Sequence, residues 1–147
     1  MKGLTKRAHK LLTVLAQDEG RRNSSSSLLP EHFLLALIKT ADGVGYEVLI
    51  NLKINILSLQ LVLEQSLKAE TNSTSFADLP PSRRLRTLLD SAAIESRTLR
   101  NDFVGTEHLV IAAAKEENSA FSDFIKKCNL KIDDLRREAS LINSSRP

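Results

Sequence analysis

The stretch FVGTEHLVIAAAKEE, residues 103–117, decides the fold because LLPEHFLLALIKTA, residues 28–41, has the same layout. In both stretches a Glu-His pair opens a mostly apolar run that ends at a lysine, and the matching residues stand 76 positions apart. The matched residues are Glu31 and Glu107, His32 and His108, and Lys39 and Lys115. This constant spacing indicates that the two stretches are copies of one unit.

The residues around these stretches repeat as well. Upstream, apolar positions recur 77 residues apart: Ala8 with Leu85, Leu11 with Leu88, Leu12 with Leu89, Leu15 with Ala92, and Ala16 with Ala93. Downstream, the offset is again 76: Val48 with Phe124, Leu49 with Ile125, Leu52 with Cys128, Ile54 with Leu130, Ile56 with Ile132, and Leu59 with Leu135. The difference of one predicts a longer loop before the Glu-His stretch in the first copy. The shared period predicts a tandem duplication.

Amphipathic and apolar segments between turn signals predict an all-α fold of eight helices, arranged as two pseudo-twofold tandem four-helix repeats. We expect residues 1–147 to form a single domain. Its parts are a first repeat at about 4–67, a polar linker closed by two prolines at 68–81, a second repeat at about 82–142 and a tail at 143–147. Thr5, Ser82 and Thr106 are expected N-caps, because their hydroxyls can accept first-turn N–H groups.

Composition limits the function classes. A net charge of +3 permits acidic partners, but the basic clusters lack interleaved aromatic residues, so nucleic acid is not an expected partner. These clusters, Arg83-Arg84-Arg86, Lys126-Lys127 and Arg136-Arg137, suit a solvated helix face or docking of an acidic adaptor. No segment has the length and apolarity of a signal peptide or membrane span, so we expect a soluble, cytoplasmic protein without a membrane partner. Cys128, the single cysteine, matches Leu52 and is expected to be a buried structural thiol.

Catalytic and metal-binding patterns are missing from the sequence. Neither a G-x-x-x-x-G-K-[ST] phosphate loop nor a G-x-S-x-G nucleophile motif occurs, so these residues are not expected to form an enzyme or to hold a cofactor. His32 and His108 fall in different repeats, and His9 has no partner at ligand spacing, so no metal site is expected. The first two histidines are expected to form hydrogen bonds in or near the core.

The tandem units, the opening GLTKRAHKLLTVLAQDE (3–19), VGTEHLVIAA (104–113) and the proline-bearing linker together resemble the N-terminal Clp repeat domain of Clp/Hsp100 AAA+ unfoldases, most closely the ClpC type. The resemblance covers about residues 4–142. It implies a compact bundle of eight helices that caps an ATP-driven ring and receives protein substrates or adaptor proteins for a compartmental protease. The ring and the protease would be partners if the chain is part of a longer protein, and the isolated domain would be a monomer.

The resemblance also implies ligand-binding residues. Glu31 and Glu107 would hold the guanidinium of a phosphorylated arginine, and Thr5 and Ser82 would help to hold its phosphate. The chain departs from the family pattern in two places: Leu29-Pro30 replaces the usual Gly-Thr, and Ser82-Arg83 stands where Thr and often Pro are usual. The alternative interpretation is that both glutamates only complement a helix dipole from the first turn.

Two functional classes remain open after this comparison. The chain is either the substrate- and adaptor-binding module of a ClpC-like unfoldase, or a stand-alone Clp-N-like regulatory protein that binds the Clp protease machinery or its adaptors. The residues NSSRP (143–147) look like the start of a linker and favour the first class. A helical DNA-binding protein is a third and more remote class.

Overall fold

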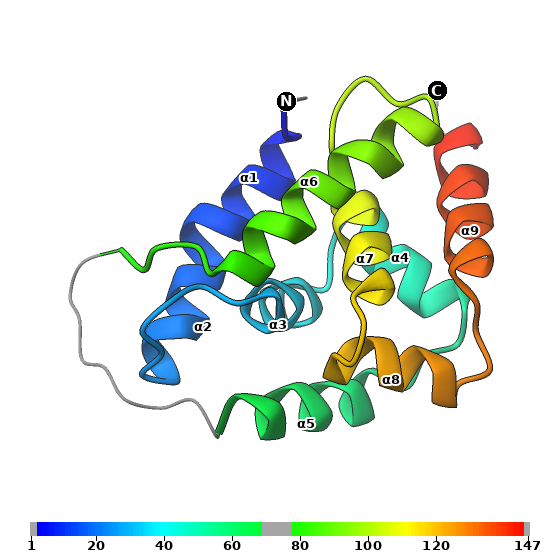
Figure 1. Cartoon of the computed structure of the whole chain (residues 1–147). Helices are drawn as coiled ribbons and strands as arrows, with labels where there is room; N and C mark the ends of the chain where they lie inside the picture. Colours follow the sequence, from blue (N-terminus) through cyan, green and yellow to red (C-terminus); the bar gives the residue numbers. More distant parts are fainter. Residues whose placement is uncertain (1–2, 69–77, 146–147) are drawn as a thin grey trace.

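The computed structural model describes residues 3–68 and 78–145, and these residues form helices joined by short loops (Figure 1). The elements are α1 (Lys6–Lys10), η1 (Leu11–Leu15), α2 (Ala16–Arg22), α3 (Pro30–Thr40), α4 (Val44–Asn51), α5 (Ile56–Leu67), α6 (Arg83–Thr98), α7 (Thr106–Lys115), α8 (Ala120–Lys127) and α9 (Ile132–Ser144). Because α1, η1 and α2 are continuous, residues 3–68 and 78–145 form eight helices. Within the described residues, β structure is limited to two isolated bridges. The expected all-α fold of eight helices is therefore confirmed.

The two Glu-His stretches form the central helices. Every residue of α3 from Pro30 to Ile38 and every residue of α7 from Thr106 to Ala114 is buried. Figure 1 shows α3 and α7 in the middle of the molecule, with α6 on one side and α5 and α8 on the other. A helix that is apolar on all faces is stable in water only if other helices surround it, so the remaining elements pack around these two.

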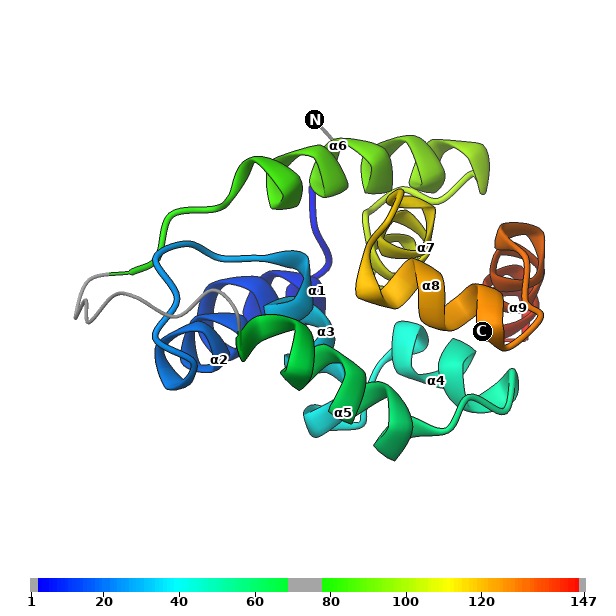
Figure 2. The same ribbon diagram turned by 60° about the horizontal axis from the view of Figure 1, so that its bottom comes forward.

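The two halves pack against each other in crossed pairs. Helix α4 packs on α9, and α5 packs on α8, so the third and fourth helices of each half contact the fourth and third of the other. Figure 2 shows these four helices on one side of the molecule, away from α6. The contacts between these helices are therefore reciprocal in helix order.

Backbone hydrogen bonds cross between the halves as well. Thr5 N donates to Val104 O at 2.9 Å, and Ser82 N donates to Leu28 O at 2.9 Å. Bridges at Leu4–Val104 and Leu28–Pro81 accompany them. The start of each first helix is thereby fixed beside the Glu-His turn of the other half, a pairing that the sequence spacing did not indicate.

The first helix contains the extra residue that the sequence analysis assigned to a loop. The loops at 23–29 and 99–105 have equal lengths, so the prediction of a longer loop is wrong. The segment η1 is a π turn, in which Ala16 N donates to Leu11 O five residues earlier. Such a turn takes up one inserted residue, so the offset changes from 77 to 76 inside the helix. Ala16 is therefore equivalent to Ala92, and Glu19 to Glu95.

The expected linker and tail are partly packed. Residues 69–77 of the linker lie outside the described residues, but Leu79 is buried, and its backbone N–H and C=O both bond to the Gln17 side chain, at 2.7 and 3.0 Å. Helix α9 continues to Ser144, so the first two residues of the expected tail are helical. Burial of Leu79 and its two bonds to Gln17 hold the end of the linker against the first helix.

The expectation of a buried thiol is wrong, because Cys128 is exposed. It occupies the C-cap of α8, where the helix ends at the surface, and its counterpart Leu52 is only partly buried.

In the described ranges, no single helix is long and apolar enough to cross a membrane. Helices α4 and α5 pass that test only as a pair, and they meet at a bend of 116°.

Candidate functional site

Each Glu-His turn is built around a buried histidine. His32 Nδ1 accepts from Leu29 N at 2.9 Å, and His108 Nδ1 accepts from Gly105 N at 2.9 Å. Because Nδ1 accepts, the proton of each neutral ring is on Nε2, which faces an asparagine oxygen: Asn23 Oδ1 at 3.1 Å and Asn101 Oδ1 at 2.8 Å. Both histidines are hydrogen-bonding groups of the core, as expected from the sequence.

Burial also fixes the charge state of the first of these rings. It lowers the pKa of His32 from 6.5 to about 4, although the Glu19 carboxylate acts in the opposite direction. The ring is therefore neutral near pH 7 and holds the turn together rather than acting on a ligand.

Thr106 does not cap α7 as the sequence analysis expected. Gly105 occupies the N-cap position, and the Thr106 hydroxyl accepts from Gly45 N of α4 at 2.8 Å. The helices approach so closely that a Cβ atom at Gly45 would lie 2.8 Å from the Thr106 carbonyl group. The hydroxyl therefore joins the two halves instead of ending a helix.

The carboxylate of Glu107 lies at a cleft of about 430 Å³, which we call the Glu107 cleft. Its wall includes Thr5, Lys6 and Arg7 of the other half, because the crossed backbone pairing brings the start of α1 to this turn. Glu107 is buried, and its Oε2 accepts from Asn143 Nδ2 of α9 at 2.9 Å. Asn143, from the expected tail, is thus a site residue that the sequence analysis missed.

Glu31 lies at the equivalent place in the other half, a cleft of about 190 Å³ that we call the Glu31 cleft. Arg84 Nη2 donates to Glu31 Oε2 at 2.6 Å, and Arg84 also donates to Glu116, from Nε to Oε2 at 2.6 Å and from Nη2 to Oε1 at 2.9 Å. The bonds to Glu116, and then those to Glu31, raise the pKa of Arg84 above its usual range. The guanidinium expected from a ligand is here supplied by the chain itself.

The remaining predicted residue, Ser82, caps α6. Its Oγ accepts from Leu85 N at 3.0 Å, and it is not among the residues lining the Glu31 cleft. Thr5 also caps its helix, with Oγ1 accepting from Ala8 N at 3.2 Å, but it lines the Glu107 cleft. The structure therefore brings Thr5 and Glu107 to one cleft.

The two clefts differ in charge because the equivalent arginines, Arg7 and Arg84, bind different partners. Arg7, the counterpart of Arg84, pairs with Asp42 at 3.1 Å instead of with Glu107. Among the described residues, the side-chain partner of Glu107 is an amide and not a cation. The Glu107 cleft thus combines one carboxylate with two cations, whereas the Glu31 cleft has an excess of carboxylates.

Two buried glutamates of the first helices, Glu19 and Glu95, were missed by the sequence analysis. Lys39 Nζ lies 2.8 Å from Glu19 Oε1, and Lys115 Nζ lies 2.8 Å from Glu95 Oε2. The repeat spacing could have revealed these ion pairs, because the two glutamates stand 76 positions apart, as do the two lysines. Arg136 adds two bonds to Glu95, at 2.8 and 3.0 Å, and this arginine, with Lys115, lowers the pKa of Glu95. These groups tie helices together.

These contacts also bear on the expected basic clusters. Arg84 and Arg136 belong to two of them, yet both bind buried glutamates of this chain. They therefore contribute to internal ion pairs rather than to a continuous basic face. Within the described ranges, no group of three or more His, Cys, Asp or Glu residues could hold a metal ion.

The fold and the paired Glu-His turns define a Clp-type repeat domain. The Clp repeat (R) N-terminal domain matches residues 3–128, so the chain belongs to that family. ClpC, the ATP-binding subunit of an ATP-dependent Clp protease from Staphylococcus epidermidis, is 27% identical over 135 residues, which cover 92% of this chain and 16% of that protein. The chaperone ClpB of Oceanobacillus iheyensis is 24% identical over 134 residues, 91% of this chain and 16% of ClpB. The chain thus spans about a sixth of the length of these relatives.

Solved structures share the fold. The Hsp104 N-terminal domain from Candida albicans gives a TM-score of 0.77 at 18% identity, covering 99% of this chain and 94% of that one. The N-terminal domain of the ClpV1 ATPase from Escherichia coli gives 0.76 at 19% identity, covering 96% and 86%. A structure described as a peptide from the EAEC T6SS Sci1 SciI protein gives 0.76 at 19% identity, covering 96% and 89%. The resemblance to Clp/Hsp100 N-terminal domains seen in the sequence is confirmed.

Proposed function

We propose that this domain is the docking module of a ClpC-like, ATP-dependent unfoldase, that it receives protein substrates or adaptors for a compartmental protease, and that its Glu107 cleft accepts a phosphorylated arginine side chain. Membership of the Clp repeat family supports the first part. Relatives named as ATP-binding subunits of a Clp protease contain this region as a small share of their length. The ATP-binding modules would accordingly lie outside these residues.

The observation that carries the ligand proposal is the distribution of charge around the Glu107 cleft. A phosphorylated arginine is a zwitterion, with a guanidinium and a phosphate joined directly. The buried carboxylate of Glu107 suits the guanidinium, which forms strong paired hydrogen bonds with carboxylates. Lys6, Arg7 and the Thr5 hydroxyl on the other wall suit the phosphate.

The pairing of Arg7 with Asp42 does not oppose this binding strongly. Their side chains are 48% and 60% exposed. An exposed ion pair of this kind contributes at most about 1 kcal/mol, so a phosphate can replace Asp42 at little cost. The pair at Arg84 is different, because it joins two carboxylates and one of them is buried. We therefore propose one ligand per domain, at Glu107.

Titration calorimetry with free phosphoarginine tests this ligand. We expect about one equivalent bound per domain. Glu107→Ala should abolish the heat, whereas Glu31→Ala, the matched control in the other half, should retain it; circular dichroism checks that both variants stay helical. The double variant should bind no better than Glu107→Ala. Absence of both heat and a shift in melting temperature would remove phosphoarginine from the proposal, and two equivalents would contradict the role of Arg84.

The unfoldase part has a separate test. Sequencing the native reading frame beyond residue 147 should reveal a G-x-x-x-x-G-K-[ST] phosphate loop in the same frame. A stop codon near Pro147 would refute this part and favour a stand-alone regulator. The two tests are independent, because a stand-alone domain could still bind the same ligand.

A further inference from the structure

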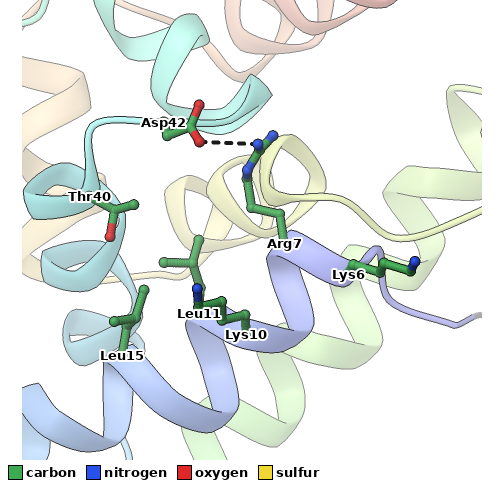
Figure 3. A pocket seen from close by; sticks show the side chains of 7 residues that line it. All are labelled: Lys6, Arg7, Lys10, Leu11, Leu15, Thr40 and Asp42. Carbon is green, nitrogen blue, oxygen red and sulfur yellow. Dashed lines mark ion pairs between the residues drawn. The ribbon is translucent and has the colours of Figure 1, made fainter.

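We infer that the first half carries a second binding site, a cationic pocket with an apolar floor on α1 and η1, which binds an acidic segment of a partner protein that includes an apolar side chain. This site, which we call the α1 pocket, measures about 310 Å³ and is lined by Lys6, Arg7, Lys10, Leu11, Leu15 and Thr40, with Asp42 at its edge. Figure 3 shows it between the first helix and the turn that follows α3.

The pocket has more positive than negative charge. Lys6 and Lys10 stand one helical turn apart, and among the described residues neither forms an ion pair. The dashed line in Figure 3 joins Arg7 to Asp42, the single acidic residue of the pocket. Three cations against one carboxylate leave a local charge that a partner with several carboxylates would neutralise.

The apolar floor distinguishes this site from a plain cationic surface. Leu11 is buried, whereas Leu15 is only partly buried, and both belong to the π turn η1. The partly exposed Leu15 offers a contact for one apolar side chain of a ligand. The pocket has no aromatic residue on which a nucleobase could stack, so its chemistry favours a peptide over a nucleic acid.

The equivalent pocket of the other half serves as an internal comparison. It measures about 160 Å³, and it has Thr87 where the α1 pocket has Lys10, Ser91 where it has Leu15, and Glu116 where it has Thr40. That pocket is smaller, and its arginine is neutralised by two carboxylates. The same helical framework therefore folds without the cation and without the leucine, so the fold alone does not explain these residues in the first half.

The α1 pocket differs from the Glu107 cleft in its composition. Both include Lys6 and Arg7, but Lys10, Leu15 and Thr40 line the α1 pocket and not the Glu107 cleft. Substitutions at Lys10 and Leu15 therefore test this inference separately from the binding of phosphoarginine.

Fluorescence anisotropy with a labelled peptide of Asp, Glu and Leu, without any arginine, tests the inference. The test variant Lys10→Thr/Leu15→Ser introduces the side chains of the other half, and the control Lys126→Thr removes one exposed lysine from α8. We expect the test variant to bind about tenfold more weakly than the wild type, and the control to bind within about twofold. Replacing Leu by Ser in the peptide should also weaken binding several-fold.

Equal losses in the test variant and in Lys126→Thr would overturn the inference, since they would reflect net charge alone. Equal affinity for the peptides with and without Leu would overturn it as well. Stronger binding of duplex DNA, with the same dependence on Lys10, would replace the peptide by a nucleic acid and refute the inference. Lys10→Glu, a change at an exposed position, provides a second variant if Leu15→Ser lowers stability. Phosphoarginine should still bind all these variants, which separates this result from a failure of the proposed function.

Discussion

Acidification should destabilise the domain through His32. The ring is fully buried, and its pKa is lowered to about 4 from 6.5 in the unfolded chain. The unfolded state therefore binds a proton at a higher pH than the folded state, so stability is full above pH 6.5 and is lost as pH falls towards 4. At pH 5 the unfolded ring is mostly protonated and the folded ring mostly neutral, which favours unfolding by a factor of about 30, or about 2 kcal/mol.

Urea unfolding followed by circular dichroism at about pH 7.5 and at pH 5 measures this effect. The wild type should lose about 2 kcal/mol through His32, in addition to what its other groups contribute. His32→Gln removes the titrating group, so its loss between the two pH values should be smaller by about that amount, although it is less stable at both. His9→Gln, at an exposed position, is the control and should behave like the wild type. Equal pH dependence in the wild type and in His32→Gln would refute the reasoning.

Three further substitutions test the packing. Gly45→Ala should destabilise the domain by about 1–3 kcal/mol in urea unfolding, because the new Cβ would meet the Thr106 backbone at 2.8 Å. Gly3→Ala is the control and should be neutral, because its Cβ would make only an ordinary contact at 3.8 Å. Thr106→Val removes the acceptor of the buried Gly45 N–H and should cost about 1–3 kcal/mol; a loss below about 0.5 kcal/mol would show that the bond is dispensable. Glu95→Gln should cost about 3 kcal/mol, since a lysine and an arginine lose their carboxylate, while the exposed Glu117→Gln should cost little; equal losses would contradict this.

Local pattern was sufficient for much of the fold. The apolar runs after the two Glu-His pairs predicted central helices, and α3 and α7 are buried on all faces. Asp42-Gly43 is a turn signal in the sequence, and Gly43 adopts φ 100°, a conformation that other residues rarely take. These features depend on the side chains of one segment, so sequence alone reveals them.

Features that depend on how the helices pack together could not be predicted in the same way. The inserted residue was detected as a change of offset, but only the structure shows that a π turn absorbs it and that Glu19 then contacts Lys39 of α3. Cys128 is the repeat counterpart of the apolar residue Leu52. It is nevertheless exposed, because α8 ends there.

The sequence by itself determined that one helical unit occurs twice and that each copy presents a glutamate at the start of its central helix. Only the tertiary structure decided that Thr5 faces Glu107 in the other copy, and that Arg84 rather than a ligand meets Glu31. The physical reason is that helix periodicity is set by residues a few positions apart. Ion pairs such as Arg84–Glu31 join residues 53 positions apart, and the way the two halves pack determines which charges meet.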